Sequence, residues 1–161
     1  MTQHSEIYPT PFGNLELSYS ENDLISVMWA KTTQKSTDLA SKPPQLQQIC
    51  ADLEHYFAGK RTNFAEIRPE NPEKTFFQRV WHACSSIPYG ETRSYQWLAT
   101  QAGSPKAVRA AGQAMARNPF HIIIPCHRVI SASGKLTGYK GGLSIKEQLL
   151  AFEAKNLVKS A

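Results

Sequence analysis

A thiol, an imidazole and a guanidinium stand next to one another at Cys126, His127 and Arg128. β-branched apolar residues precede and follow the three, which predicts buried extended backbone on both sides. Burying such polar groups is costly unless each has a partner or a chemical role. Pro125 restricts the backbone, so we expect a sharp bend just before the thiol. A cysteine on a stiff bend beside a base is typical of a nucleophile, and the alternative is a small cysteine that only packs.

A reactive cysteine must be ionised, and His127 is the nearest base in the sequence. Adjacent side chains of extended backbone point to opposite faces, so a bridging water is expected between thiol and imidazole unless the bend at Pro125 is sharp. A third group should orient the imidazole. Glu153, beside the apolar Phe152 on the last predicted helix, is the candidate carboxylate. The alternative is that Glu153 is a solvated charge on the helix surface.

The residues around this segment predict a mostly helical half of the chain. Apolar spacing indicates helices over residues 75–86, 94–101, 105–118 and 144–156. Cys84 lies on the apolar side of the first helix and is expected in the core. The second and third helices are joined by a short turn that contains Gly103, which is the outline of a helix-turn-helix.

The predicted helix 105–118 carries few large side chains. Alanines and Gly112 cover most of it, and its long polar side chains are few. Val108 and Met115 share a face that should meet the core, whereas Arg109 lies on the other side. A single Arg on a helix of small residues suits insertion of its side chain into a nucleic-acid groove. The helix itself would contact the nucleic acid through its shape and the phosphate backbone rather than by reading base edges. The alternative is tight helix packing within the domain.

The N-terminal half predicts a β meander over residues 8–29, a polar loop over 31–42, a helix over 44–57 and a strand over 62–67. Residues 68–72 form the best linker, so we place a domain boundary there, giving domains 1–72 and 73–161. The charge reverses at this boundary: six Lys or Arg against nine Asp or Glu before Glu73, and twelve against four from there on. The basic half indicates a polyanionic partner, with surface solubility as the alternative.

Length and composition exclude several classes of protein. The chain has 161 residues, 41% of them hydrophobic, which suits one ordinary domain or two small ones. No apolar run approaches the ~20 residues of a membrane helix, and residues 1–11 do not form a signal peptide. The three cysteines, Cys50, Cys84 and Cys126, are an odd and widely spaced set without zinc-finger spacing. We therefore expect a cytoplasmic protein without disulfides or a bound metal.

The segment Pro125-Cys126-His127-Arg128-Val129 is similar to the active-site motif of the O6-alkylguanine-DNA alkyltransferases. The resemblance extends from Phe76 to Glu153 and is carried by residues 89–95, 104–110, 118–119, 137–139 with 141–142, and 146–147 with 149–150. It implies an α+β fold: an N-terminal antiparallel sheet domain like that of ribonuclease H, and a mostly helical C-terminal domain with a helix-turn-helix. The N-terminal half resembles the family only loosely, and the zinc ligands of some relatives are absent from it.

The resemblance also implies a reaction on double-stranded DNA that contains O6-alkylguanine, carried out by a monomer without a cofactor. Cys126 would attack the alkyl carbon in an SN2 displacement and keep the group as a thioether, so that each molecule reacts once. His127 would take the thiol proton through a water and be oriented by Glu153. Asn118 would help to hold the bend and the thiolate, and Tyr95 would donate a proton to guanine N3.

Base flipping from the minor groove is implied as well, with Arg109 filling the stack that the base leaves. The implied DNA-binding residues are Tyr95, Lys106, Ala107, Arg109, Ala110 and Gln113. The implied substrate pocket contains Pro125, Val129, Tyr139 and Lys140. Two positions depart from the family: Gln113 stands where many relatives have a small residue, and Lys140 occupies a variable loop position.

Other functions remain open from the residues alone. A lesion-binding relative without chemistry would lack the cysteine, and Cys126 is present. A helix-turn-helix regulator with a structural thiol should show a dimerisation element or a ligand domain, and none is evident. A cysteine hydrolase is a weaker alternative, because no oxyanion site can be read from the sequence.

Overall fold

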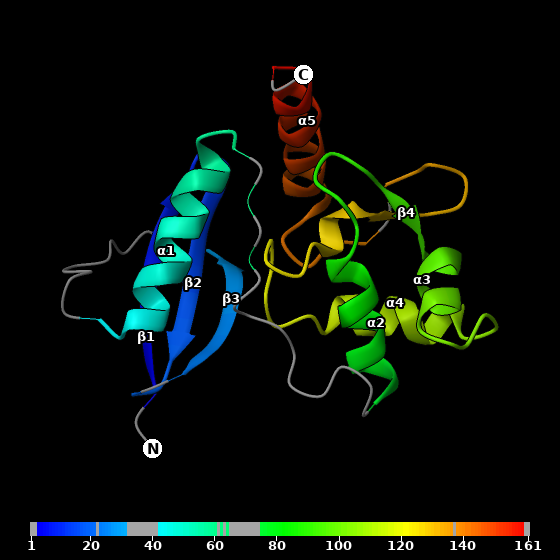
Figure 1. The fold of residues 1–161 in the computed structure, drawn as a ribbon, viewed down its shortest axis with the longest axis horizontal. Coiled ribbons are helices and arrows are strands. Elements are labelled where there is room, and N and C mark those ends of the chain that lie inside the picture. Colours follow the sequence, from blue (N-terminus) through cyan, green and yellow to red (C-terminus); the bar gives the residue numbers. More distant parts are fainter. Residues whose placement is uncertain are drawn as a thin grey trace. The chain divides into compact units, whose positions relative to one another are not determined.

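The computed structural model describes residues 3–21, 23–31, 42–60, 62, 64, 75–136 and 138–159. The chain divides into two compact units, residues 1–64 and 65–161 (Figure 1). The predicted boundary at residues 72 and 73 lies outside the described residues. Most of the predicted loop 31–42 and of the predicted strand 62–67 lies outside them too.

The first unit is an antiparallel sheet with one helix. Strands β1 (His4–Thr10), β2 (Gly13–Tyr19) and β3 (Leu24–Ala30) pair in chain order. Strand β1 starts earlier than the predicted meander, because His4 pairs with Tyr19 although the first strand residues are polar. Helix α1 (Pro44–Phe57) has the predicted bounds and packs on the sheet (Figure 1). The backbone N–H of Leu24 donates to Gln45 Oε1 at 2.7 Å.

The second unit is mostly helical. It contains α2 (Phe76–Ser85), β4 (Arg93–Ser94), α3 (Tyr95–Gln101), α4 (Val108–Ala116), a 3₁₀ turn (Cys126–Arg128), β5 (Val129–Ile130) and α5 (Leu143–Lys159). Thr75 and Gln78 form a capping box at the start of α2, and the Ser94 hydroxyl accepts the Trp97 N–H at the start of α3. The predicted starts of these two helices are therefore confirmed.

Helix α4 begins three residues later than predicted. Pro105 and Lys106 lie in a turn that is closed by a hydrogen bond from the Ala107 N–H to the Ser104 carbonyl at 2.9 Å. Val108, Ala111 and Met115 pack on the core, as expected. Helix α5 is longer than predicted at both ends. The parallel pair of β4 and β5, in which Arg93 faces Val129, is not predicted from the sequence.

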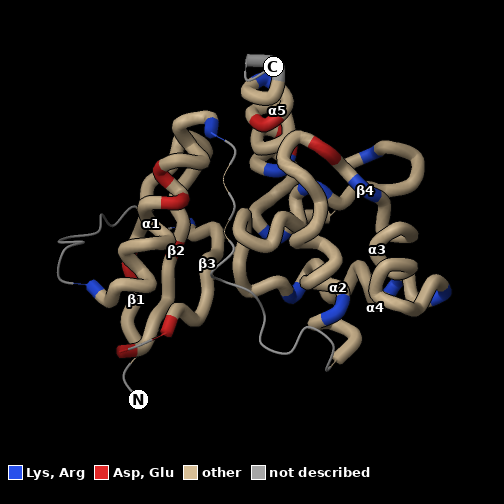
Figure 2. Tube along the Cα trace, in the orientation of Figure 1, with Lys and Arg blue, Asp and Glu red and all other residues tan. Residues whose placement is uncertain are grey.

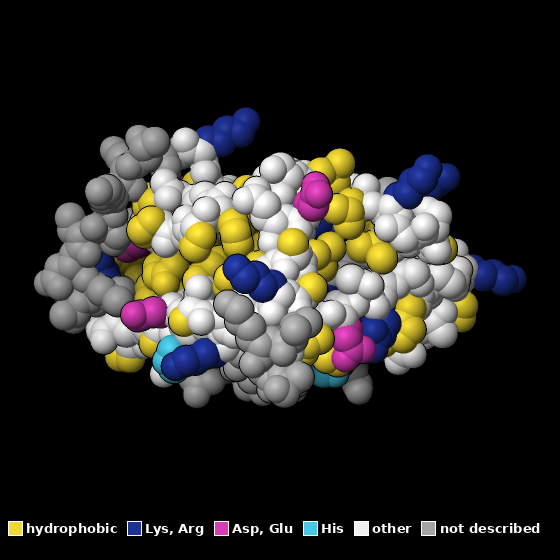
Figure 3. Space-filling view, turned by 90° about the horizontal axis from the view of Figure 1, so that it is seen from above, with side chains coloured by type: hydrophobic (Ala, Val, Ile, Leu, Met, Phe, Trp, Pro, Cys, Tyr) yellow, Lys and Arg dark blue, Asp and Glu magenta, His cyan; other side chains and the backbone are white. Residues whose placement is uncertain are grey.

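The two units differ in charge. Figure 2 shows Asp and Glu frequently among the described residues of the first unit, and Lys and Arg frequently among those of the second. The Lys and Arg side chains on the face drawn in Figure 3 are dispersed rather than gathered in one patch. Within the described residues, no helix has the length and apolar character needed to cross a bilayer.

Candidate active site

Asn118 shapes the approach to the thiol. Its buried side-chain amide donates to the Ile124 carbonyl at 2.8 Å, and its side-chain oxygen accepts the Phe120 N–H at 2.9 Å. The segment that these bonds close is a turn, so the prediction of extended backbone before Cys126 is wrong. Ile122 within it has φ +72°, a costly conformation for a β-branched residue. Strain of this kind concentrates at functional sites.

The sharp bend predicted at Pro125 is confirmed. Pro125 has φ −79° and ψ 64°, and the Cys126 N–H donates to the Ile124 carbonyl at 2.7 Å, which together form an inverse γ-turn. The 3₁₀ turn follows at once and places Cys126, His127 and Arg128 on different sides of one tight loop. Only β5, after the turn, is extended. Two successive turns thus hold the thiol.

Glu153 of α5 is the centre of a buried charge network. Its Oε2 lies 2.6 Å from His127 Nε2 and 3.0 Å from Arg128 Nη2. Its Oε1 accepts Arg128 Nε at 2.8 Å and the Gly90 N–H at 3.1 Å. Arg128 also donates to the Ile87 carbonyl at 2.8 Å. Burial opposes ionisation of Glu153, but His127 and Arg128 outweigh it and hold the pKa of the carboxyl well below its usual range.

The network assigns a tautomer to His127. Burial lowers the pKa of this histidine, which favours the neutral ring. With Glu153 ionised, His127 Nε2 must carry the proton and donate it to the carboxylate, so Nδ1 holds the lone pair. Nδ1 is buried, and no hydrogen-bond partner contacts it among the described residues. A buried base is therefore available beside Cys126.

The thiol of Cys126 is protonated at rest. Burial raises its pKa to about 11, although a hydrogen bond with Asn118 and the charge of Lys146 act in the opposite direction. The side chain is only 6% exposed. Since the thiolate is the nucleophile, the proton has to leave when the reaction occurs, and a neighbouring neutral base is needed for that.

A cavity of about 390 Å³ opens onto the thiol. Its lining residues are Tyr95, Gly112, Met115, Ala116, Cys126, Gly138, Tyr139 and Lys140. Two of the predicted pocket residues, Tyr139 and Lys140, are in this wall. The other two, Pro125 and Val129, are buried and are not in it. Val129 packs in the core, and its carbonyl accepts Lys146 Nζ at 2.7 Å.

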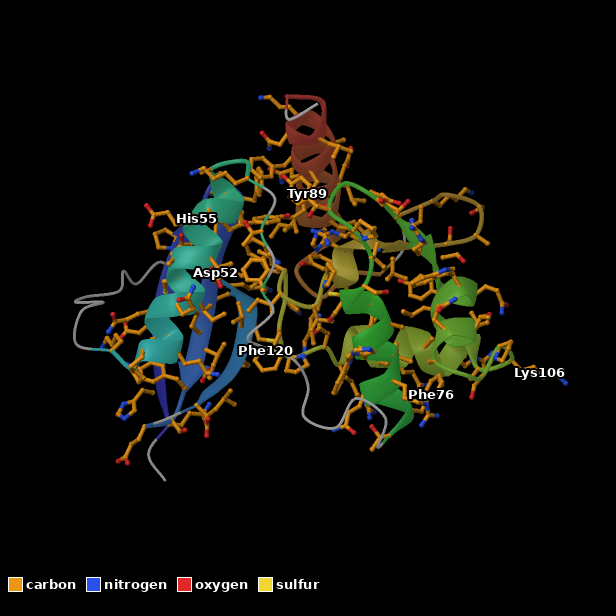
Figure 4. All side chains as sticks on the ribbon, viewed as in Figure 1. Asp52, His55, Phe76, Tyr89, Lys106 and Phe120 are labelled. Carbon is orange, nitrogen blue, oxygen red and sulfur yellow. The ribbon has the colours of Figure 1, made fainter. Side chains whose placement is uncertain are left out.

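The predicted DNA-binding residues lie together at the turn before α4 and on α4 itself. Lys106, Arg109 and Gln113 are exposed, and Ala107 and Ala110 are half-buried. A shallow depression of about 530 Å³ is lined by residues 104–107. Lys106 extends outward from this turn (Figure 4). Tyr95, the remaining predicted DNA-binding residue, lies at the start of α3 and lines the cavity.

Family models match both parts of the chain. Residues 4–68 match the ribonuclease-like domain of 6-O-methylguanine DNA methyltransferase, and residues 75–155 match its DNA-binding domain. The chain belongs to the 6-O-methylguanine DNA methyltransferase family. The resemblance noted in the sequence and the predicted α+β fold, with a ribonuclease-like sheet domain and a helical domain, are confirmed.

Relatives in this methyltransferase family cover nearly the whole chain. The methylated-DNA–protein-cysteine methyltransferase of Methanosarcina acetivorans is 44% identical over 151 residues, which covers 91% of this chain and 96% of the relative. That of Mycobacterium leprae is 42% identical over 159 residues and covers 98% and 96%. The structure of Mycobacterium tuberculosis OGT in complex with DNA has a TM-score of 0.78 at 41% identity, covering 95% of this chain and 94% of that one.

The methyltransferase site contains residues whose part in the site the sequence does not indicate. The sequence marks Arg128 only as a buried polar group, and Lys146 only as part of the family resemblance. Gly112, Met115 and Ala116 of α4 form part of the cavity wall, and such small or apolar residues carry no chemical signature in a sequence. No three His, Cys, Asp or Glu side chains are grouped to hold a metal ion in the described part of the chain.

His121 predicts a loss of stability in acid. It is buried, its ring lies 5.7 Å from the Tyr139 ring, and burial, aided by Lys140 and His127, lowers its pKa to about 4. A histidine in the unfolded chain has a pKa of about 6.5. Between about pH 6.5 and 4 the unfolded chain therefore binds a proton at this position, whereas the folded chain does not. Stability should therefore fall as the pH drops from about 6.5 to 4, by on the order of 3 kcal/mol from this group.

Urea unfolding between pH 7.5 and 4 measures the effect. His121→Phe keeps an aromatic ring against Tyr139 and removes the titration, so its stability should depend less steeply on pH than that of the wild type. His127 titrates in the same direction in both proteins, so the difference between the two slopes reports His121 together with its coupling to His127. Equal slopes in the two proteins would show that the His121 proton does not contribute.

Proposed function

We propose that this protein repairs O6-alkylguanine in double-stranded DNA by moving the alkyl group to its own Cys126, once per molecule. The observation that carries the proposal is the position of Cys126 at the wall of the cavity, with the His127–Glu153–Arg128 network behind it. Its relatives are named methylated-DNA–protein-cysteine methyltransferases, and this is the activity of the chain.

The target base must leave the double helix to reach the thiol. Cys126 is nearly buried and its cavity is enclosed by α4, Tyr95 and the 138–140 loop, so a stacked base has no access. Extrusion through the minor groove costs a few kcal/mol, and less for a damaged pair. The Arg109 side chain fills the space that the extruded base leaves in the stack. Contacts with the DNA backbone and groove come from Lys106, Ala107, Ala110 and Gln113.

The transfer itself needs one proton acceptor and one proton donor. The Cys126 proton passes through a water to His127 Nδ1, and the Glu153 carboxylate stabilises the resulting imidazolium. The sulfur then attacks the alkyl carbon in line: the S–C bond forms, the C–O6 bond breaks, and its electron pair stays on guanine. Tyr95 donates a proton to guanine N3, so the base leaves neutral. No cofactor is required, because the protein is the acceptor.

The product explains the single turnover. A thioether has no good leaving group, so Cys126 is not regenerated. Tyr139 and Lys140 line the space for the alkyl group and base, and backbone groups near Cys126 and Lys140 complete the recognition of the base. Asn118 supports the thiolate through its hydrogen bond to Cys126. We propose that residues 1–72 form a structural domain, that residues 73–161 bind DNA and accept the alkyl group, and that the protein acts as a monomer.

Incubation with free O6-benzylguanine should add one benzyl group per molecule. Intact-mass spectrometry followed by peptide mapping should place it on Cys126. Cys126→Ala should show no adduct, whereas Cys84→Ala, which removes another buried thiol, should react as the wild type does. An unchanged wild-type mass, or an adduct that persists in Cys126→Ala, would contradict the proposed function.

A further inference from the structure

Lys140 places a positive charge in the wall of the cavity that opens onto Cys126. The other lining side chains are two tyrosines, the thiol and small or apolar groups. No acidic side chain is among the lining residues in the part of the chain that the structure describes. The transfer of a neutral alkyl group, as described above, gives the charge of Lys140 no task.

A turn fixes the backbone at Lys140. The Gly142 N–H donates to the Tyr139 carbonyl at 2.9 Å, and Lys140 is the second residue of the turn that this bond closes. Gly142 has φ +100°, a conformation that a residue with a side chain would adopt only with strain. Helix α5 begins at the next residue, Leu143. The Lys140 side chain is exposed, so its ammonium group stays hydrated and can still approach an occupant of the cavity.

No carboxylate forms an ion pair with Lys140 among the described residues. Glu153, the carboxylate behind the thiol, is bound by His127 and Arg128. The charge of Lys140 also acts on the buried His121, where it adds to the effect of burial in lowering the pKa of the histidine. The cation is therefore available to a negative group inside the cavity.

A negative charge on the alkyl group would hinder transfer in a cavity without a cation. The sulfur attacks as an anion, so it repels a carboxylate that is attached to the carbon under attack. The repulsion is stronger in a partly enclosed cavity than in bulk water. A lysine in the wall offsets it, and the flexible stem of this side chain lets the ammonium group meet carboxylates of different reach.

We propose that Lys140 adapts this protein to O6-alkyl groups that end in an anion, of which carboxymethyl is the simplest. This rests on the proposed function and names a substrate class for it. The Cys126 sulfur attacks the methylene carbon, the S–C bond forms, the C–O6 bond breaks, and guanine leaves with the proton that Tyr95 donates. The carboxylate takes no part in these bond changes and remains on the S-carboxymethyl thioether, beside Lys140.

The test compares two free bases of nearly the same shape. O6-carboxymethylguanine is anionic at about pH 7.5, and O6-carbamoylmethylguanine is neutral. The readout is the ratio of their rates of adduct formation on Cys126, followed by intact-mass spectrometry. Lys140→Met should lower the ratio of the anionic to the neutral base about fivefold, because the anion loses its partner. Added salt should lower the ratio in the wild type but not in Lys140→Met.

Two control variants isolate the charge at this position. Lys140→Arg retains a cation and should keep the wild-type ratio. Lys135→Met removes an exposed lysine that is not among the residues of the cavity wall, and it should keep the wild-type ratio as well. A loss of the ratio in Lys135→Met as large as that in Lys140→Met would overturn the proposal, since it would show a general effect of net charge.

Free bases also separate this role from a contact with DNA. If Lys140 only binds a phosphate, Lys140→Met should slow both lesions equally in duplex DNA and leave the free-base ratio unchanged, which would overturn the proposal. Equal losses with the two free bases would overturn it too, because they would show damage to the wall rather than loss of a charge. So would a wild type that reacts with O6-benzylguanine but not with O6-carboxymethylguanine. A wild type that forms no adduct with any of the three bases would instead refute the proposed function.

Discussion

Glu153→Gln is expected to slow alkyl transfer by on the order of 10³-fold and to destabilise the second unit by about 3–5 kcal/mol. The Glu153 carboxylate accepts four hydrogen bonds from three residues, all in a buried site. A glutamine offers one acceptor oxygen and turns an NH₂ group toward donors. Arg128 would then be a buried cation without its counter-charge.

The loss of activity follows from the tautomer of His127. With a carboxylate at Oε2, His127 Nε2 donates and Nδ1 is the base. An amide NH₂ in that place favours the other tautomer, in which Nδ1 carries the proton and cannot accept one from Cys126. The ring would also lose the anion that stabilises its protonated state. Both effects act on the step that ionises the thiol.

The rate of adduct formation with O6-benzylguanine and urea unfolding measure the two effects separately. The assay is run at low temperature, where the variant is folded, so that the rate reports chemistry. Glu147→Gln, on the exposed side of the same helix, is the matched control and should change neither value. A folded Glu153→Gln protein that reacts at the wild-type rate would exclude the assigned role of the His127–Glu153 pair.

The helices with local start signals were predicted best. Thr75 and Gln78 form a capping box, Ser94 is an N-cap and Pro44 is the first residue of its helix, so α1, α2 and α3 lie within one residue of their predicted starts. The start of α4 was misplaced because Pro105 is also suited to the turn in which it lies. Helix starts are predictable when a local signal marks them: a side chain that caps the first turn in α2 and α3, or a proline at the first helical position in α1.

The backbone around the thiol was predicted less well, because side-chain hydrogen bonds of Asn118 and a long-range strand pair determine it. Consecutive isoleucines before Pro125 are typical of a strand, yet the side chain of Asn118 bonds across the segment and folds it into a turn. The β4–β5 pair joins two-residue strands 36 positions apart, too short to leave a periodic pattern. The strand propensity of these residues is therefore outweighed by specific hydrogen bonds.

The proposed catalytic residues were easier to predict from the sequence than the residues that line the cavity. Glu153 was identified as a carboxylate next to an apolar residue on a helix, and the structure places it against His127. Arg128 completes that network from across the turn, which no sequence spacing indicates. Val129 was assigned to the pocket, but its side chain is in the core and its carbonyl binds Lys146. The shape of the cavity depends on packing, which the sequence does not display residue by residue.

Arg109→Ala is expected to lower repair of O6-alkylguanine in duplex DNA on the order of 10- to 100-fold, with less than about a twofold change for the free base. Arg109 is exposed on α4 and is not among the residues that line the cavity, so we do not expect it to contact a base held at Cys126. Its proposed role is to occupy the stack after the base has left. The free base needs no extrusion, and its reaction should therefore be insensitive.

Two further variants separate stacking from charge. Arg109→Lys keeps the positive charge but not the planar guanidinium, so it should restore little of the duplex activity if Arg109 fills the stack. A phosphate contact, by contrast, would be restored by lysine. Lys155→Ala removes a cation of the second unit outside the helix-turn-helix and should leave both reactions unchanged. Equal losses on duplex and free base in Arg109→Ala, or full recovery in Arg109→Lys, would exclude the stacking role and leave a positional or a purely electrostatic one.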